Sequence, residues 1–293
     1  MAHASSSANL SVSNIFSFKD HVCLVTGGAT GLGEMAAQAF VQNGAKVIIA
    51  SRKESELKKT ADRLNQLGPG RCDYVTADLK DKAGCLDLCK KVKQKTDRLT
   101  VLLNNSGATW GGAYDDFPES GWDKIYALNV KAMFYTTVGL DAELKKGASA
   151  GNPSRVINIA SMAGVQTTDV TTGSEGGLSA PGHGTFSYGP SKAACIHLTK
   201  MQASKLMPEH VTVNVICPGV FPSRMTAYGF ESAMDTLVSG QPSGRVGKPE
   251  DFAGVVLFLS SMGAAHMTGN VIELDGGSTQ SGFRSKRKER ANM

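Results

Sequence analysis

A tyrosine and a lysine that could exchange a proton are spaced four residues apart, at Tyr188 and Lys192. If the segment is helical, this spacing places the phenol and the ammonium on one face. A free phenol has a pKa of about 10, and an ammonium close to it favours the ionised form. The pair could therefore deliver a proton to a reacting oxygen. This spacing is common, and taken alone it would be explained better by a surface tyrosine and lysine.

Two further polar residues are candidates for the same site. Ser161 follows directly after the apolar run Arg155–Ala160, and Asn129 lies within the helical pattern that begins near Trp122. A hydroxyl beside a phenol could hydrogen-bond a carbonyl oxygen while hydride is added to its carbon. The four residues together favour an enzyme.

A glycine-rich segment near the amino terminus could bind a phosphate. The run Thr26–Gly33 reads TGGATGLG, follows a predicted strand and precedes a predicted helix. Glycines permit a tight turn and close backbone approach, and a helix N-terminus offers free N–H groups to an anion. This context favours a dinucleotide pyrophosphate site over a simple turn.

The end of the second predicted strand indicates which dinucleotide is bound. A site for NAD usually has a carboxylate there to hold the ribose 2′-hydroxyl. This chain instead has Ser51 and Arg52, which could bind a 2′-phosphate. The sequence therefore predicts NADPH/NADP+, although Arg52 and Lys53 could also be an ordinary solvated helix start.

The elements that would position these residues alternate between short apolar strands and longer helices. The predicted fold is a single-domain α/β Rossmann fold, a doubly wound seven-stranded parallel sheet with helices on both faces. Parallel strands end at one edge, where ligands bind. The strands are expected at Val22–Thr26, Lys46–Ala50, Asp73–Ala77, Thr100–Asn104, Arg155–Ala160, Val211–Cys217 and Asn270–Leu274, with helices at Glu34–Asn43, Glu54–Leu67 and Trp122–Lys145.

The remaining segments set the boundaries of the domain. Residues 1–18 are predicted to be a flexible N-terminal tail, 19–280 the domain, and 281–293 a basic C-terminal tail. The stretch 166–187 is rich in Thr, Gly and Ser and is expected to be a loop. The six cysteines form no C-x-x-C pair, so we expect reduced thiols and no metal site. No apolar run is long enough to predict a membrane helix, and no secretory signal is evident.

The motifs together resemble the short-chain dehydrogenase/reductase family, over about Val22 to Gly277. The glycine spacing T-G-x-x-x-G-x-G, the Tyr188–Lys192 pair and the strings NNSGATWGG, RVINIASMAG, YGPSKAA and PGVFPSRMT carry this resemblance. They look most like a branch that contains the rhamnolipid-pathway ketoacyl reductase and fungal polyketide-pathway reductases. Ser106 stands where the family more often has alanine.

The resemblance implies specific roles for residues of this chain. Ser161, Tyr188 and Lys192 would be catalytic, and Asn129 would support a proton relay through water. Asp78 would lie beside the adenine, although it could also cap the helix expected near Lys80. The implied cofactor-binding set is Gly27, Thr30, Gly31, Leu32, Gly33, Ser51, Arg52, Asp78, Asn105, Lys131, Tyr188, Lys192, Phe221 and Ser223.

These observations predict an NADPH-dependent reductase that transfers hydride to a ketone or conjugated enone of a ketoacyl or polyketide-like substrate. The resemblance also implies a homotetramer built through the helices from about Trp122 and Ser187, and the reduced thiols predict a cytoplasmic location. Two alternatives are an NADP-dependent alcohol dehydrogenase working in the oxidation direction and a non-catalytic NADPH-binding regulator. A third, nucleic-acid binding through the basic tail, lacks interleaved aromatic residues, so we expect no nucleic-acid partner.

Overall fold

The structure is a computed structural model, which describes residues 8–167, 183–223, 226–227, 230, 234–239 and 241–280. A seven-stranded sheet in the order β3-β2-β1-β4-β5-β6-β7 forms its centre, and every pair of neighbouring strands is parallel. The predicted doubly wound fold is therefore confirmed. The strands are β1 (Val22–Thr26), β2 (Lys46–Ser51), β3 (Arg71–Thr76), β4 (Val101–Asn104), β5 (Ser154–Ile159), β6 (Val211–Pro218) and β7 (Val271–Leu274).

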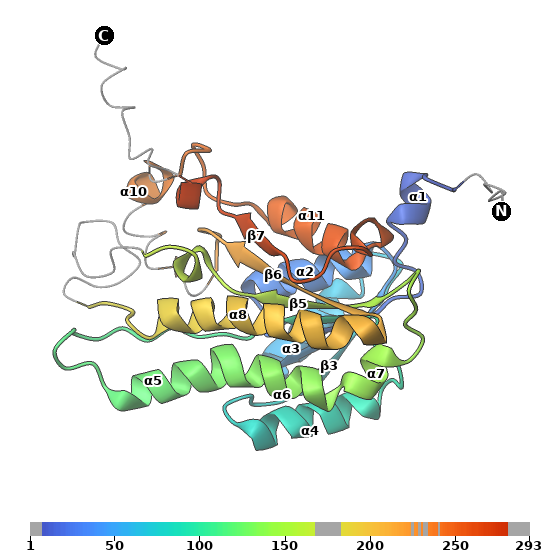
Figure 1. The fold of residues 1–293 in the computed structure, drawn as a ribbon, viewed down its shortest axis with the longest axis horizontal. Helices are drawn as coiled ribbons and strands as arrows, with labels where there is room; N and C mark the ends of the chain where they lie inside the picture. The colour runs from blue at the N-terminus through green and yellow to red at the C-terminus, as the bar shows by residue number, and fades with distance from the viewer. Residues whose placement is uncertain are drawn as a thin grey trace, which may run out of the picture.

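Helices cover both faces of this sheet (Figure 1). One core packs α2, α3 and α11 around Phe40, Leu57 and Phe252, and the other packs α4, α6, α7 and α8 around Leu88 and Leu140. The helices are α1 (Val12–Ile15), α2 (Gly31–Gln42), α3 (Glu54–Leu64), α4 (Lys82–Lys93), α5 (Glu119–Tyr126), α6 (Ala132–Gly139), α7 (Asp141–Lys145), α8 (Tyr188–Leu206), α10 (Met234–Ser239) and α11 (Pro249–Ser260). No helix in the described part of the chain is long and apolar enough to span a membrane.

The helix predicted over Trp122–Lys145 is interrupted in the structure. Between α5 and α6 the chain forms a π-helical segment, Ala127–Lys131, and α6 ends before Leu140, whose φ is −112°. A π-helical turn contains one extra residue, which redirects its side chains and is common at functional sites. The apolar pattern detected the helix but not this insertion.

Several other boundaries differ from the prediction by one to three residues; α2, for example, begins at Gly31 rather than Glu34. The third strand begins at Arg71 rather than Asp73, because it pairs with Lys46 along the edge of the sheet, where polar residues are tolerated. The predicted tail of residues 1–18 is wrong at its end, since Val12–Ile15 is helical and Phe18 is only 2% exposed. The predicted tail 281–293 and residues 168–182 of the predicted loop lie outside the described residues.

Buried polar side chains cross-link the sheet to the long helix α8. Asn104 on β4 donates to Asn158 Oδ1 on β5 at 2.9 Å, and Asn158 donates to Thr199 Oγ1 on α8 at 2.9 Å. All three are at most 2% exposed. A satisfied buried network of this kind specifies one arrangement of its elements. It therefore fixes α8, which begins at Tyr188, against the two central strands.

His21 lies directly before β1, at the amino-terminal end of this strand, and makes the stability of the protein depend on pH. Burial, and secondarily the buried Arg155 guanidinium, lowers the pKa of His21 to about 4. The Nδ1 atom of His21 is buried without a hydrogen-bond partner among the described residues, and its ring lies 5.0 Å from Phe18. The folded protein therefore keeps this imidazole neutral, whereas the unfolded chain protonates it at a pKa of about 6.5.

We expect the free energy of unfolding to fall as the pH drops from about 6.5 towards 4, because only the unfolded state binds the His21 proton there. Between about pH 7 and pH 4.5, His21 should account for roughly 2–3 kcal/mol of this loss. His21→Phe keeps a ring against Phe18 and should flatten the pH dependence by that amount. Urea unfolding of both proteins at the two pH values measures it, and parallel pH profiles would contradict the assignment.

Candidate active site

The glycine-rich turn joins β1 to α2 at the carboxyl edge of the sheet. Gly27 and Gly31 have positive φ values of 65° and 57°, which favour glycine. A Cβ on Gly33 would lie 2.3 Å from Gly27 O, so only glycine lets the helix pack this closely on the turn. Thr30 is the N-cap of α2 in extended conformation, and its side chain makes no capping hydrogen bond. The Thr30 side chain therefore does not occupy the first amides of α2, which can bind an anion as a pyrophosphate site requires. Leu32 packs partly buried against the core.

Polar residues follow the second and third strands at the same edge. Ser51 is the last residue of β2 and half-buried, and Arg52 is exposed with no ion pair to any described residue. The neighbouring Lys53 is already paired with Glu56 at 3.5 Å. The cation left for an anionic ligand here is Arg52.

Asp78 lies after β3 and is exposed. Its carboxylate accepts a hydrogen bond from Lys80 N at 3.2 Å, which closes a local turn. It does not cap the next helix, as the alternative interpretation proposed, because α4 begins at Lys82 and Asp81 caps it by accepting from Gly84 N at 2.8 Å. The Asp78 side chain thus stays available at the rim of the site.

Three predicted catalytic side chains meet at this edge. Tyr188 is the first residue of α8, and Lys192 Nζ lies 5.6 Å from the centre of its ring. Lys192 is 3% exposed and donates to Ile159 O, at the end of β5, at 2.9 Å. Ser161 follows the same strand and accepts from Ala163 N at 3.2 Å. The buried ammonium thus links the phenol to the strand that carries the hydroxyl.

Asn129 connects the π-helical segment to this group. It is fully buried, and its Nδ2 donates to Ala108 O and Ser191 Oγ, each at 3.0 Å, while its Oδ1 accepts from Ala108 N at 2.9 Å. Ser191 Oγ donates in turn to Tyr188 O at 2.6 Å. Both amide hydrogens of Asn129 are therefore used to hold neighbouring segments, so its side chain positions the turn of Tyr188.

Two other predicted cofactor residues lie in different settings. Asn105 follows β4 and donates through Nδ2 to Thr26 O and Gly27 O, at 3.0 and 3.3 Å. It therefore holds the glycine turn in place. Lys131 ends the π-helical segment and is exposed, with no hydrogen bond or ion pair to other described residues.

The segment after β6 returns to the glycine turn. Phe221 is 3% exposed and packs its ring on Phe252, with centroids 6.1 Å apart, so only its backbone can face a ligand. A Cβ added to Gly31 would lie 3.3 Å from Ser223 Cβ, so this serine lies beside the turn. Thr226 accepts from Ser223 N at 3.0 Å and donates to Phe221 O at 2.7 Å.

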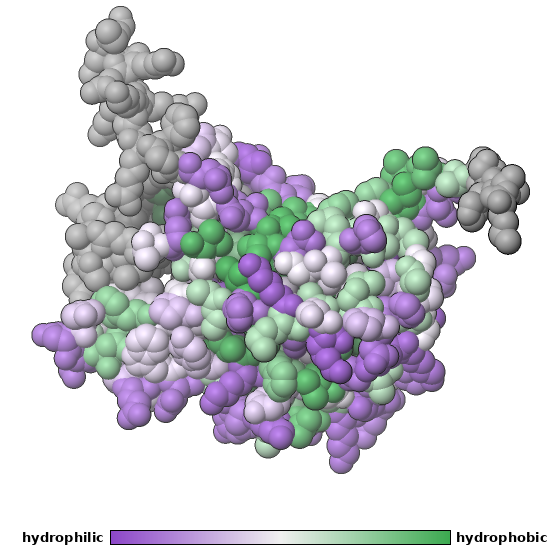
Figure 2. Space-filling model, viewed as in Figure 1, coloured by the Kyte–Doolittle hydropathy of each residue, from purple (hydrophilic) through white to green (hydrophobic). Residues whose placement is uncertain are grey.

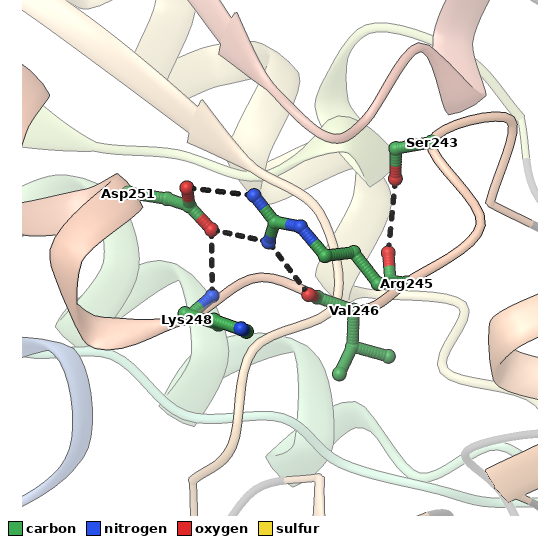
Figure 3. Close-up of polar contacts among 5 residues, drawn as sticks. All are labelled: Ser243, Arg245, Val246, Lys248 and Asp251. Atoms are coloured by element: carbon green, nitrogen blue, oxygen red, sulfur yellow. Dashed lines mark hydrogen bonds and ion pairs between the residues drawn. The ribbon is translucent and has the colours of Figure 1, made fainter.

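Arg245, Lys248 and Asp251 form a charged clamp at the start of α11 (Figure 3). Arg245 pairs with both carboxylate oxygens of Asp251, at 2.5 and 2.9 Å, and Lys248 N donates to the same carboxylate at 2.8 Å. Hydrogen bonds from Arg245 and the Lys248 amide lower the pKa of Asp251 to about 2. The clamp holds the start of α11 next to Gly247, whose N–H donates to Val220 O at 2.9 Å.

Three residues that organise the site were not predicted as site residues from the sequence. Ser191 joins Asn129 to Tyr188, Thr226 organises the Phe221–Ser223 turn, and Thr26 Oγ1 accepts from the amides of Asn105 and Ser106 at 3.0 Å each. Thr26 is the first residue of the glycine motif, so its place in the motif could have identified it as a site residue. The other two depend on contacts between distant segments, which no local pattern indicates.

The described residues offer no metal site and no reactive thiol. They contain no group of three His, Cys, Asp or Glu side chains close enough to hold an ion. All six cysteines are free and buried. Burial raises the pKa of Cys195 to about 11 and of Cys217 to about 12, so these thiols stay protonated at neutral pH.

A parallel sheet with a phosphate-binding turn and a Tyr–Lys pair at one edge defines a dinucleotide-dependent oxidoreductase. A family model described as enoyl-(acyl carrier protein) reductase matches residues 27–279. The chain belongs to the short-chain dehydrogenase/reductase family. The predicted enzyme class is thereby confirmed.

Individual relatives agree with this assignment. The rhamnolipids biosynthesis 3-oxoacyl-[acyl-carrier-protein] reductase of Pseudomonas aeruginosa is 41% identical over 264 residues, which cover 89% of this chain and 97% of the relative. The 3-oxoacyl-[acyl-carrier-protein] reductase FabG of Thermotoga maritima is 32% identical over 87% of this chain and 96% of its own. A solved structure of the Pseudomonas aeruginosa RhlG/NADP active-site complex superposes with a TM-score of 0.83 at 40% identity, covering 90% of this chain and 98% of that one.

Proposed function

We propose that this protein is an NADPH-dependent ketoreductase in which Tyr188 donates the proton. The observation that carries the proposal is the placement of Tyr188, Lys192 and Ser161 at the same sheet edge as the free helix N-terminus after the glycine turn. This arrangement places a proton donor beside a site that fits a pyrophosphate. A 3-oxoacyl reductase relative and an NADP complex of a similar structure support it.

NADPH, when bound, would supply a hydride from its nicotinamide C4 to the substrate carbon. Ser161 and Tyr188 would hydrogen-bond the carbonyl oxygen, and Tyr188 would give it a proton as charge develops. The buried Lys192 ammonium lies 5.6 Å from the centre of the Tyr188 ring, so it would offset the negative charge that proton transfer leaves there. Asn129 would support proton resupply by holding the Tyr188 turn, since its own amide hydrogens are occupied.

The cofactor-binding residues divide between the two ends of NADPH. Gly27, Gly31 and Gly33 leave room for the pyrophosphate, with Thr30 and Leu32 at the start of the helix. Ser51 and Arg52 would bind the 2′-phosphate, and Asp78 would lie beside the adenine. The Asn105, Lys131, Phe221 and Ser223 positions would surround the nicotinamide half, Asn105 and Ser223 through their contacts with the turn.

The substrate is proposed to be a ketoacyl or polyketide-like compound, in a pathway of secondary metabolism. The two relatives named as 3-oxoacyl-[acyl-carrier-protein] reductases support a 3-oxoacyl group over a conjugated C=C. Their names also favour reduction over the oxidation direction. A silent NADPH-binding regulator is disfavoured because Ser161, Tyr188 and Lys192 are all present and lie together.

The decisive test is NADPH oxidation by the purified protein with a panel of carbonyl substrates. A 3-oxoacyl thioester should give turnover with NADPH, whereas an α,β-unsaturated thioester should give none. Following absorbance at the nicotinamide band measures both reactions. Turnover of the unsaturated thioester alone would show that C=C reduction is the activity, and absence of turnover with every substrate would overturn the proposal.

We also propose a homotetramer in the cytoplasm. Large apolar side chains are exposed on the helices expected to assemble it, including Phe134 and Val138 on α6 and Met201 on α8. Figure 2 shows further apolar side chains gathered along the edge strand β7, between α8 and α11. The six unpaired cysteines are typical of a reducing compartment.

A further inference from the structure

Two segments beside Tyr188 are joined by a short antiparallel bridge between glycines. Gly112 N donates to Gly184 O at 3.1 Å, and Gly184 N donates to Gly112 O at 2.8 Å. Gly112 belongs to the connection from β4 to α5, and Gly184 to the segment that leads into α8. Tyr188 N donates to Thr185 O at 2.9 Å, so the bridge is fixed to the turn that carries the phenol.

Aromatic rings lie directly on both bridge glycines. A Cβ on Gly112 would come 3.0 Å from the ring of Phe117, and a Cβ on Gly184 would come 2.4 Å from the ring of Phe186. These two rings meet edge to face with centroids 5.6 Å apart, and Tyr114 meets Phe186 in the same way at 5.2 Å. We call Tyr114, Phe117 and Phe186 the aromatic wall. A side chain at Gly184 would displace the Phe186 ring, and one at Gly112 would press on the ring of Phe117.

The connection that carries the wall is also held at its other end. Ala108 exchanges two hydrogen bonds with Asn129, which donates to Ser191 Oγ, and Ser191 donates to Tyr188 O. The β4–α5 connection is therefore tied to the Tyr188 turn at two points, before and at Gly112. The wall is consequently fixed beside the backbone turn that leads into Tyr188.

The outer ring of the wall is largely free. Tyr114 is 80% exposed, whereas Phe117 and Phe186 are half-buried beneath it. Asp115 and Asp116, which follow Tyr114, are exposed and would repel an anionic group. Aromatic faces and edges bind flat or extended apolar groups well. This combination suits an uncharged apolar group that extends from the carbonyl.

We propose that the aromatic wall binds the uncharged apolar part of the substrate, an extended acyl chain or an aromatic ring, and so selects long substrates over short ones. The inference rests on the proposed function, because Tyr188 fixes where the carbonyl lies. The wall touches the substrate beyond the reacting carbonyl and takes no part in the proton transfer. Tyr114 is thus a specificity residue of this site.

The test compares a short and a long substrate in variants of one exposed ring. We expect Tyr114→Ala to lower kcat/KM for a 3-oxodecanoyl thioester of N-acetylcysteamine about tenfold, mainly through KM, because one aromatic contact is lost. For the acetoacetyl thioester the change should stay within about twofold, because that chain ends before the wall. Tyr114→Phe keeps the ring and should keep the preference for the long chain. Val12→Ala, an exposed apolar truncation on α1, should change neither value.

A binding measurement separates this inference from the proposed function. In a Tyr188→Phe background with NADP+, calorimetry should show that Tyr114→Ala weakens binding of the 3-hydroxydecanoyl thioester about tenfold. Equal losses for long and short chains, or unchanged binding of the long chain, would overturn the aromatic wall. If the unmodified protein reduces neither thioester, the proposed function fails, and the calorimetric comparison still decides whether the wall binds apolar chains.

Discussion

Replacing Tyr188 with phenylalanine should lower kcat for ketone reduction by roughly 10²–10⁴-fold, because the variant loses the general acid. The ring remains at the start of α8, and Lys192 keeps its hydrogen bond to Ile159 O, so the fold and the cofactor site should persist. The dissociation constant of NADPH, measured by quenching of protein fluorescence, should change by less than about threefold. The effect therefore falls on turnover rather than on cofactor binding.

The chain contains a matched control for this variant. Tyr135 on α6 also has a lysine beside its ring, with Lys82 Nζ 5.3 Å from the centroid, but it packs against the core on the α4 side of the sheet. Tyr135→Phe removes the same hydroxyl from a similar pair and should leave kcat within about twofold. A comparable loss of kcat in both variants would show that removing a tyrosine hydroxyl acts through stability rather than catalysis. If Tyr188→Phe kept its activity, Tyr188 would not be the proton donor.

The sequence predicted the fold almost completely because every strand in the centre of the sheet is buried on both faces. β6 is buried at each of its eight residues and β5 at each of its six, so these strands appear as mostly apolar stretches without regular alternation. The edge strand β3 alternates exposed and buried residues instead, and its predicted start was two residues late. The accuracy of the strand boundaries therefore follows the burial of the strands.

The candidate site was predictable where its chemistry lies within one segment. The glycine turn and the Tyr188–Lys192 pair each occupy a short stretch, and helical periodicity gives their relative position directly. The π-helical turn around Asn129 was not predictable, because the sequence Ala127–Lys131 fits an ordinary helix and the extra residue is stabilised by Ala108 and Ser191 from elsewhere. Distant hydrogen bonds select this backbone.

The same distinction explains Phe221 and Phe18. The resemblance implied a cofactor contact at Phe221, and the structure explains how a large residue fits there. Gly247 lacks a side chain, so the ring turns into the core against Phe252. Phe18 follows a polar stretch and was placed in a tail, yet it packs 6.1 Å from Phe40. In both cases a partner far away in the sequence determines where an aromatic ring is buried.

The choice between NADPH and NADH should depend on the two residues at the end of β2. Arg52 makes no ion pair with a described residue, so its guanidinium can give charge-assisted hydrogen bonds to a 2′-phosphate. Removing it as Arg52→Ala should lower kcat/KM for NADPH by roughly 10–100-fold, since each such bond contributes about 1.5–3 kcal/mol. The value for NADH, which has no 2′-phosphate, should change by less than about threefold.

Introducing a carboxylate should invert the preference rather than merely weaken it. Ser51→Asp places a negative charge at the last residue of β2, where it can bind a ribose 2′-hydroxyl and repel a 2′-phosphate. Combined with Arg52→Ala, it should shift the ratio of kcat/KM for NADPH over NADH by roughly 10³-fold. Lys58→Ala, which removes one charge from α3 where Lys58 pairs with Asp62 at 2.7 Å, is the matched control and should leave the ratio unchanged. If Arg52→Ala and Ser51→Asp changed the ratio for NADPH over NADH no more than Lys58→Ala does, the 2′-phosphate would have to bind elsewhere. Among the described residues directly after β2, Arg52 is the cation without an ion pair, since Lys53 pairs with Glu56.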